Sequence, residues 1–472
     1  MFIGRKQELR EMELRYKMPG FQMFVLYGRR RVGKTRLIQE FCKNKRTLFH
    51  VGIQQTRDAH LRAFSQDVLE QLPSEGSDFI RQFQSWEDAF SYITKQTREQ
   101  RIVLVMDEYP YIAQTEPALS SMLQKVIDHD WKQTQLFLIL CGSSMSFMEH
   151  QVLGYQSPLY GRRTAQLKVS PLPCWESIGF FKHWSWQDAL YGYGACGGIP
   201  QYLEYFSAHP DFPSAVKAEF LSLSGHLAQE PANLMQQEMR EPAVYNSVID
   251  AIAGGHTRQY EIAQKVGKDA RDISSYIKAL LDLEIVVKKM PVGEKNARKT
   301  LYSLADNLYR FWYRFLPRSL ALVSLGLSNE AWEQIIDPEL DAYFGPIFED
   351  ISMQYIQHEV QQGRMVPVYQ EYGRWWGNNP RKKREEEIDV VAVHPEEILI
   401  GECKWRNEPV DVEVFELLRE RGELIRHGRG IRYALFSRSG FTAGMRTLAA
   451  RDHVLLVEGQ DMTGMQDTDI RC

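Results

Sequence analysis

One stretch near the N-terminus constrains the fold of this chain more than any other: FQMFVLYGRRRVGKTRLIQEF, residues 21–41. Its apolar run Met23–Tyr27 predicts a buried strand, and the apolar positions after residue 36 recur at helical spacing. The loop between them, Gly28–Thr35, has the spacing G-x-x-x-x-G-K-T. Glycines at these positions let backbone N–H groups surround phosphate oxygens at a helix N-terminus. The stretch therefore predicts an α/β fold with a parallel sheet that carries a nucleotide-binding loop.

A second apolar run supplies the acidic partner that a bound cation needs. Ile102–Met106 predicts a strand buried on both faces of a parallel sheet, and it ends in Asp107 and Glu108. Ligands bind at the carboxyl ends of such strands. We expect Lys34 to reach the β- and γ-phosphates of ATP, and Thr35 and Asp107 to bind Mg²⁺. Glu108 would orient or deprotonate the attacking water.

A third apolar run, QLFLILCGSS, ends in Ser143 and Ser144, which can sense a γ-phosphate. The later segment SPLYGRR offers Arg162 and Arg163 as transition-state arginines, acting in cis or in trans. The alternative is that both arginines are ordinary surface charge. The predicted nucleotide-binding set is Gly28, Gly33, Lys34, Thr35, Arg36, Asp107 and Ser143.

Length and composition bound the number of parts and the compartment. A chain of 472 residues is too long for a single core and predicts about three domains. No apolar run approaches the ~20 residues that span a bilayer, and the charged start MFIGRKQELREMEL lacks the apolar region of a signal peptide. The 6 cysteines are scattered, which favours a reduced, cytoplasmic compartment. A net charge of -4 leaves a role with nucleic acid open, because a local basic face suffices for it.

Six segments together resemble the archaeal-type ATPases, a branch of the STAND/AAA+ group of P-loop ATPases. In chain order they are FIGRKQELREME, LYGRRRVGKT, LVMDEYPYI, LCGSSMSFME, SPLYGRR and GGIPQYLEYF. The resemblance covers residues 1–225 and implies that Phe2–Glu8 forms part of the adenine pocket. It also implies that Gly198–Pro200 lies in a helical lid near the nucleotide. Members of this group act as monomers or rings, so a homo-oligomer is a further expectation.

Residues 241–305 predict three short helices and a β-hairpin, the layout of a winged helix. The hairpin loop is locally basic and would contact DNA phosphates; a lid or protein-contact role is the alternative. Its basic residues are Lys288, Lys289, Lys295, Arg298 and Lys299. The exposed face of the third helix is expected to carry Arg271, Ser274, Ser275 and Lys278. The aromatic segment DNLYRFWYRFLP that follows predicts an interdomain packing helix, with base stacking as the alternative.

The C-terminal segment IDVVAVHPEEILIGECKW, residues 388–405, predicts a hairpin in which Asp389 faces Glu402. The other predicted pairs are Val391–Ile400, Val393–Ile398 and Glu387–Lys404. Like charges directly opposite, with Cβ atoms about 5 Å apart, are destabilising. Two such carboxylates suit a divalent cation with hard oxygen ligands. The alternative is a surface ion pair of Glu387 with Lys404, which accounts for the lysine but not for the acids.

This hairpin also resembles the PD-(D/E)xK nuclease fold, with an acid on one strand and Glu402-Cys403-Lys404 on the next. The resemblance implies that Asp389 and Glu402 hold Mg²⁺ and that Lys404 helps to activate the attacking water. It implies a further acid, Glu349, on the preceding helix, and an αβββαβ core. Ile388 stands where the motif would have proline. The fold also exists as a DNA-binding module that does not cleave.

These interpretations combine into an α/β protein with a P-loop ATPase domain, a helical lid, a winged helix and a nuclease-like domain. The predicted boundaries are 1–170 for the ATPase domain, 171–238 for the lid, 239–305 for the winged helix, 306–339 for a helical linker and 340–472 for the nuclease-like domain. The predicted activity is ATP hydrolysis coupled to action on DNA. Two alternatives stay open: a nucleotide-switched regulator without nuclease activity, and a protein-binding scaffold.

Overall fold

A computed structural model of the chain describes residues 2–74, 77–98, 100–294, 296, 299–425 and 428–465. The chain forms two compact units. Unit 1 comprises Met1–Leu172 and Ile199–Gln201, and unit 2 comprises Pro173–Gly198 and Tyr202–Cys472. Within the described residues, no helix is both long enough and apolar enough to cross a membrane.

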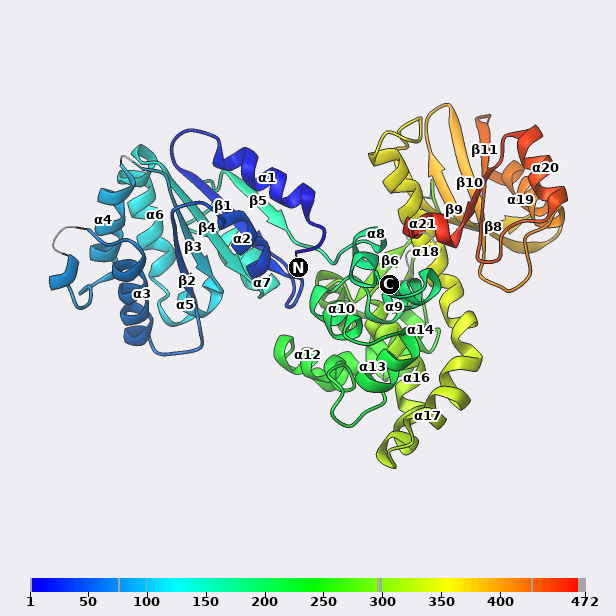
Figure 1. Cartoon of the computed structure of the whole chain (residues 1–472), viewed down its shortest axis with the longest axis horizontal. Coiled ribbons are helices and arrows are strands. Elements are labelled where there is room, and N and C mark those ends of the chain that lie inside the picture. Colours follow the sequence, from blue (N-terminus) through cyan, green and yellow to red (C-terminus); the bar gives the residue numbers. More distant parts are fainter. Residues whose placement is uncertain are drawn as a thin grey trace. The chain divides into compact units, whose positions relative to one another are not determined.

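Unit 1 is built on a parallel sheet of five strands in the order β2-β3-β4-β1-β5. The strands are β1 (Gln22–Tyr27), β2 (Thr47–Val51), β3 (Ile102–Asp107), β4 (Leu136–Gly142) and β5 (Ala165–Lys168). The helices are α1 (Lys6–Tyr16), α2 (Lys34–Cys42), α3 (Arg57–Gln71), α4 (Trp86–Thr97), α5 (Tyr109–Thr115), α6 (Leu119–His129) and α7 (Met145–Phe147). In Figure 1, α3, α4 and α6 lie on one side of the sheet and α1 and α2 on the other.

The three apolar runs of the sequence are the central strands of this sheet. Every residue of β1, β3 and β4 is buried, because helices cover both faces of a parallel sheet. The loop and helix of the G-x-x-x-x-G-K-T segment follow β1 directly. The predicted parallel α/β sheet is therefore confirmed, and it places the phosphate-binding loop at the carboxyl end of β1.

The N-terminal part of unit 2 is helical. Its helices are α8 (Cys174–Ser177), α9 (Trp186–Cys196), α10 (Pro200–Ser207), α11 (Phe212–Glu219), α12 (Glu230–Glu238), α13 (Pro242–Ala253), α14 (Gln259–Val266) and α15 (Ala270–Asp282). An antiparallel hairpin of β6 (Val286–Lys289) and β7 (Leu301–Leu304) follows α15. Three helices and a hairpin thus occupy the segment for which a winged helix is predicted.

The aromatic segment forms the first half of α16 (Asn307–Ser324). Phe311 and Phe315 are fully buried, and the Phe311 ring contacts Phe220 and Tyr343. These contacts support the packing interpretation of the segment over base stacking. The short helix α17 (Ser328–Ala331) and the long helix α18 (Leu340–Gln361) come next. Pro346 lies inside α18, which begins at Leu340.

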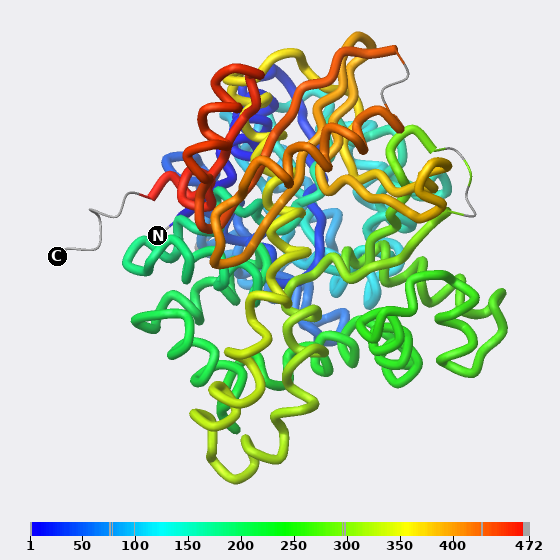
Figure 2. Tube along the Cα trace, turned by 90° about the vertical axis from the view of Figure 1, so that its right-hand side faces the viewer, coloured from blue at the N-terminus to red at the C-terminus, as the bar shows by residue number. Residues whose placement is uncertain are grey.

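A mixed sheet in the order β12-β11-β10-β9-β8 forms the C-terminal part of unit 2. Its strands are β8 (Glu371–Asn379), β9 (Arg384–Val393), β10 (Glu397–Lys404), β11 (Gly430–Ser437) and β12 (Leu455–Glu458). The helices are α19 (Val412–Ile425), α20 (Ala443–Asp452) and α21 (Gly459–Thr463). With α18 in front, the element order includes the predicted αβββαβ sequence. In Figure 2 the green trace after β6 lies beside the yellow trace of β8, where the N–H of Val292 donates to the carbonyl of Arg374 over 2.9 Å.

Candidate functional sites

The phosphate-binding loop has the backbone and the lysine that its sequence predicts. Gly33 adopts a φ of 89°, a left-handed conformation that favours glycine. Lys34 is buried, and its Nζ donates to the carbonyls of Gly28 and Arg29 over 2.9 and 3.0 Å. These carbonyls hold the ammonium at the loop, and a phosphate would draw it away from them. Arg5, in the segment expected at the adenine, donates to the carbonyl of Val32 over 3.0 Å.

The predicted residues of the cation and water site lie together. Asp107 and Glu108 stand at the carboxyl end of β3, Ser143 follows β4, and Thr35 lies in the first turn of α2. The hydroxyl of Thr35 donates to Oδ2 of Asp107 over 2.6 Å, so both oxygens can serve one small cation. Glu108 has a φ of 49°, which is strained for a residue with a side chain. Its Oε2 accepts from the hydroxyl and the N–H of Ser143 over 2.8 and 3.2 Å. Ser143, the candidate γ-phosphate sensor, therefore holds Glu108, the candidate base, in place.

The structure gives the two candidate arginines other partners. Arg162 pairs with Asp128 over 2.7 Å. Arg163 donates to the carbonyl of Leu153 over 3.1 Å, and its guanidinium lies over the Tyr160 ring. These contacts anchor both side chains to their own surroundings, and a role at the phosphate stays a prediction. Arg36 is exposed on α2.

The C-terminal hairpin has the predicted register over its paired residues. Ile398 pairs with Val393 and Ile400 with Val391, as the sequence predicts, and the pairing ends at Val390 and Gly401. The opposition of Asp389 and Glu402 stays a prediction. On its other side, β9 meets β8 with a shift: Gly373 pairs with Val391, whereas Trp375 pairs with Ile388. Two residues of β9, Asp389 and Val390, therefore stand opposite the single residue Arg374. Such a bulge re-aims a side chain and is common next to active sites.

Asp389 lies in this bulge and is 9% exposed. Its Oδ2 accepts from the N–H of Cys403 over 2.9 Å. Burial, the Glu402 carboxylate and the Glu349 carboxylate together raise the pKa of Asp389 to about 8. Two acids, on β10 and α18, thus disfavour the charged form of Asp389 on β9.

Each neighbour of Asp389 has a basic partner. Lys404 pairs with Glu402 over 2.6 Å, and not with Glu387 as in the alternative of a surface ion pair. Arg421, on α19, pairs with the other oxygen of Glu402 over 2.9 Å and with Glu386 over 3.1 Å. Burial lowers the pKa of Lys404 but the Glu402 carboxylate outweighs it, so the pKa lies above its ordinary value. Lys404 therefore acts as a cation here.

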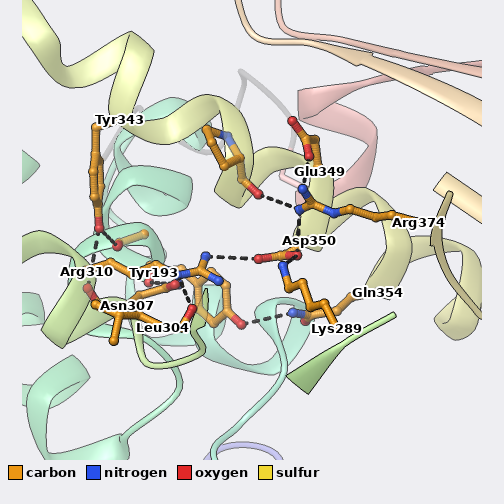
Figure 3. A network of polar contacts seen from close by, with 12 residues as sticks. Tyr193, Lys289, Leu304, Asn307, Arg310, Tyr343, Glu349, Asp350, Gln354 and Arg374 are labelled. Carbon is orange, nitrogen blue, oxygen red and sulfur yellow. Dashed lines mark hydrogen bonds and ion pairs between the residues drawn. The ribbon is translucent and has the colours of Figure 1, made fainter. Parts of the chain in front are cut away.

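Glu349 and its neighbour Asp350 belong to a larger network, drawn in Figure 3. Arg374 contacts Glu349 with one nitrogen and Asp350 with the other, the latter over 2.8 Å. Asp350 also pairs with Arg310 over 2.9 Å and with Lys289 over 3.4 Å. Within the described residues, no group of three or more His, Cys, Asp or Glu is arranged to hold a metal ion. In the acid site, which comprises Asp389, Glu402 and Glu349, cations instead hold the carboxylates of Glu402 and Glu349.

Residues 2–206 match a family described as an ATPase domain predominantly from Archaea. This match supports the expected likeness of the N-terminal part of the chain to archaeal-type ATPases. Residues 312–415 match a second family, described as archaeal and bacterial proteins of unknown function.

Individual relatives extend these matches. An uncharacterized protein of Methanocaldococcus jannaschii is 28% identical over 410 residues, 86% of this chain and 88% of the relative. An uncharacterized ATP-binding protein of the same organism is 48% identical over 46 residues, 10% of this chain and 78% of the relative. Among solved structures, the Walker-type ATPase of Pyrococcus abyssi has a TM-score of 0.53 at 19% identity, over 66% of this chain and 96% of that chain. This likeness shows a shared fold.

Sequence reasoning missed four residues around the acid site: Arg374, Asp350, Arg421 and Glu386. Asp350 adjoins Glu349, so an acidic pair on one helix could have been noticed. Arg374 and Arg421 lie in no motif, because their partners come from other elements. Only the folded chain brings these charges together.

Replacing Asp350 by asparagine is expected to lower the free energy of unfolding at pH 7 by about 2–3 kcal/mol, because it leaves three cations without their carboxylate. The value is below that of a fully buried pair, since 31% of the Asp350 side chain is exposed. Burial alone raises the pKa of Asp350, but Arg310, Lys289 and Arg374 bring it far below its ordinary range. The contribution is therefore present above pH about 4 and is lost in more acidic solution.

Urea unfolding at pH 7 and pH 3 measures this effect. The difference between wild type and Asp350→Asn should be largest at pH 7 and should shrink at pH 3. Asp337→Asn, an exposed aspartate before α18, is the matched control and should behave as wild type. Equal stability of Asp350→Asn and wild type at pH 7 would contradict the network.

Proposed function

We propose that this protein hydrolyses ATP in unit 1 and acts on DNA through unit 2. The observation that carries the ATPase proposal is the hydrogen bond between Thr35 and Asp107 beside the buried Lys34. The hard oxygens of Thr35 and Asp107 fit Mg²⁺, which would neutralise charge on the β- and γ-phosphates. Lys34 binds the phosphates, Ser143 releases Glu108 to the attacking water, and Arg162 or Arg163 acts in cis or in trans. The family of residues 2–206 supports this reading.

The C-terminal part of unit 2 is proposed to be a metal-dependent nuclease of the PD-(D/E)xK type. The position of the Asp389 carboxylate on the N–H of Cys403, next to Glu402, supports it, because carboxylate oxygens fit Mg²⁺ or Mn²⁺. Glu349, which pairs with Arg374 in this structure, would be a third donor once released. The bound cation would supply an activated water. Lys404, held on Glu402, would stabilise charge on the phosphate under attack.

DNA binding is proposed for the exposed face of α15, within a winged helix formed by α13–α15 and the β6–β7 hairpin. Its side chains are Arg271, Ser274, Ser275 and Lys278, all exposed. The hairpin itself offers less free charge than its sequence predicts, because Lys289 pairs with Asp350 and Lys299 with Glu294. Lys295 and Arg298 lie outside the described residues.

A non-cleaving, nucleotide-switched regulator is the second candidate. The observation that favours it is that Arg374, Lys404 and Arg421 already neutralise the acids Glu349 and Glu402. In this state the acid site is closed by its own cations, and unit 2 would bind DNA without cutting it.

One experiment separates the two candidates. The purified chain is incubated with linear, circular and single-stranded DNA, with Mg²⁺ or Mn²⁺, with and without ATP. A nuclease cleaves, and Glu402→Gln abolishes the cleavage while the exposed control Glu396→Gln retains it. Salt-dependent binding without cleavage in any condition supports the regulator.

A further inference from the structure

Asp350 is a point of convergence for three elements of unit 2. Arg310 comes from α16, Lys289 from the end of β6 and Arg374 from β8. All three reach the Asp350 carboxylate, as Figure 3 shows, over 2.9, 3.4 and 2.8 Å respectively. Within the part of the chain that the structure describes, these three cations face two carboxylates, Asp350 and Glu349. The network therefore holds one positive charge more than it holds negative charges.

Arg374 is the member that both carboxylates share. One of its nitrogens contacts Glu349, and the other contacts Asp350 and the carbonyl of Pro346, the latter over 3.1 Å. Arg374 is also the residue opposite the bulge that carries Asp389. Its guanidinium thus stands between the acid site and the Asp350 network.

The β6–β7 hairpin is docked against this same strand. The N–H of Val292 donates to the carbonyl of Arg374 over 2.9 Å, and the N–H of Gly293 donates to Glu371 over 3.0 Å. A Cβ added at Gly373 would lie 2.9 Å from a methyl carbon of Val292, so the two backbones approach closely. Lys289 closes the contact through Asp350.

The docked hairpin and the acid site share one cavity of about 620 Å³. Lys289 lines it from the hairpin, Arg374 from β8, Asp389 from β9 and Arg421 from α19. A movement of the hairpin therefore changes the wall of the space into which Asp389 opens.

We propose that Arg374 is a positioning residue for the acid site, and that docking of the hairpin through Lys289 decides how Arg374 is shared between Glu349 and Asp350. The inference rests on the proposed metal site. With Lys289 docked, Asp350 has two other cations, and Arg374 keeps its contact with Glu349 beside its contact with Asp350. The guanidinium then keeps the Glu349 carboxylate from joining Asp389 and Glu402 around a divalent cation.

Undocking of the hairpin reverses this division. Asp350 then loses the Lys289 ammonium, and a partly buried carboxylate with fewer partners attracts the remaining cations more strongly. Arg374 then gives up its contact with Glu349 in favour of Asp350 alone, and Glu349 is released toward Asp389 and Glu402. The acid site is thereby completed when the hairpin is engaged elsewhere.

Binding of Mn²⁺ alone to the full-length chain tests the proposal, followed by the electron paramagnetic resonance signal of free Mn²⁺ without nucleotide. The acid-site component is the binding that Glu402→Gln removes. Arg374→Gln is expected to tighten this component about tenfold, because it removes the competing guanidinium. Lys289→Met is expected to tighten it about fivefold, and the exposed neighbour Lys288→Met to leave it unchanged.

The double variant and the thermal melts complete the test. Lys289→Met added to Arg374→Gln should tighten Mn²⁺ binding no further, because the shared guanidinium is already gone. Melting of Arg374→Gln should occur at a lower temperature than that of wild type and should recover on addition of Mn²⁺. A merely structural arginine would lower the melting temperature without tightening Mn²⁺ binding.

Three results would overturn the inference, and one of them concerns the proposed function itself. Weaker or unchanged Mn²⁺ binding in Arg374→Gln removes the role of Arg374. Equal behaviour of Lys289→Met and Lys288→Met removes the role of docking, and this comparison stands even where Arg374→Gln does not fold. If Glu402→Gln binds Mn²⁺ as wild type does, none of the Mn²⁺ binding depends on the acid site, and the proposed metal site is refuted.

Discussion

We expect that replacing Glu108 by glutamine lowers the rate of ATP turnover by about 100- to 1,000-fold, because a general base usually contributes a rate factor of this size. Glutamine keeps the size of the side chain and loses the charge that orients and deprotonates water. Nucleotide affinity should change little, because Lys34 and Thr35 are left in place. Steady-state phosphate release and equilibrium binding of a fluorescent ATP analogue measure the two properties separately.

The matched control is Glu87→Gln, which changes an exposed glutamate in the first turn of α4. It should turn over ATP at the rate of wild type. Lys34→Ala should differ from Glu108→Gln by losing nucleotide binding as well, since Lys34 is the residue expected on the phosphates. Hydrolysis at this loop would be refuted if Glu108→Gln and Lys34→Ala both turned over ATP at rates within twofold of wild type, which is about the scatter of such measurements.

Truncation of Trp405 to alanine should lower the free energy of unfolding of unit 2 by about 3–5 kcal/mol. The ring is buried, with its centroid 4.5 Å from that of Phe344 and 4.9 Å from that of Phe348. Its Nε1 donates to the hydroxyl of Tyr191 over 3.1 Å and to Asp341 over 3.2 Å. Alanine leaves a cavity among these aromatic rings and leaves their polar groups without the indole donor.

Hydrogen exchange in peptides from β10, α9 and α18 measures the loss of stability, because Trp405 joins these elements. Trp405→Phe keeps an aromatic ring and should cost less than the alanine variant. Tyr155→Ala, at an aromatic side chain that is 84% exposed, should leave exchange in unit 2 unchanged. Because Lys404 precedes Trp405 directly, Trp405→Ala should also weaken the Mn²⁺ component that depends on Glu402. Unchanged protection of β10 in Trp405→Ala would contradict the packing described for this residue.

Local patterns accounted for the features that a short segment encodes by itself. The parallel sheet of unit 1 was predictable because β1, β3 and β4 are unbroken apolar runs, and a strand covered on both faces requires them. The pairing of Val391 with Ile400 was predictable because the apolar side chains of β9 and β10 match in only one register. Both features depend on neighbours along the chain or across one tight turn.

The partners of the acid site were beyond such reasoning. The alternative reading paired Lys404 with Glu387 across the hairpin, yet the lysine pairs with Glu402 two residues away on its own strand. The shift that places Asp389 opposite Arg374 arises where β9 meets β8, a strand that the hairpin sequence does not contain. An alternating pattern of apolar and polar residues in β9 predicts which side chains share a face of the strand. It does not indicate a bulge where β9 pairs with β8.

The sequence by itself determined the phosphate-binding loop, the acids at the end of β3 and the register of the C-terminal hairpin, because each lies within one strand–loop–helix or hairpin. Only the tertiary structure decided which cation each carboxylate meets. Asp350 pairs with Lys289, 61 residues away in the sequence, and with Arg310, 40 residues away. Arg374 on β8 contacts two neighbouring acids of α18, Glu349 and Asp350. Charges pair through space and over several ångströms, and sequence distance sets no limit on them. That pairing, and not the acid motif alone, determines whether Glu349 is available to the acid site.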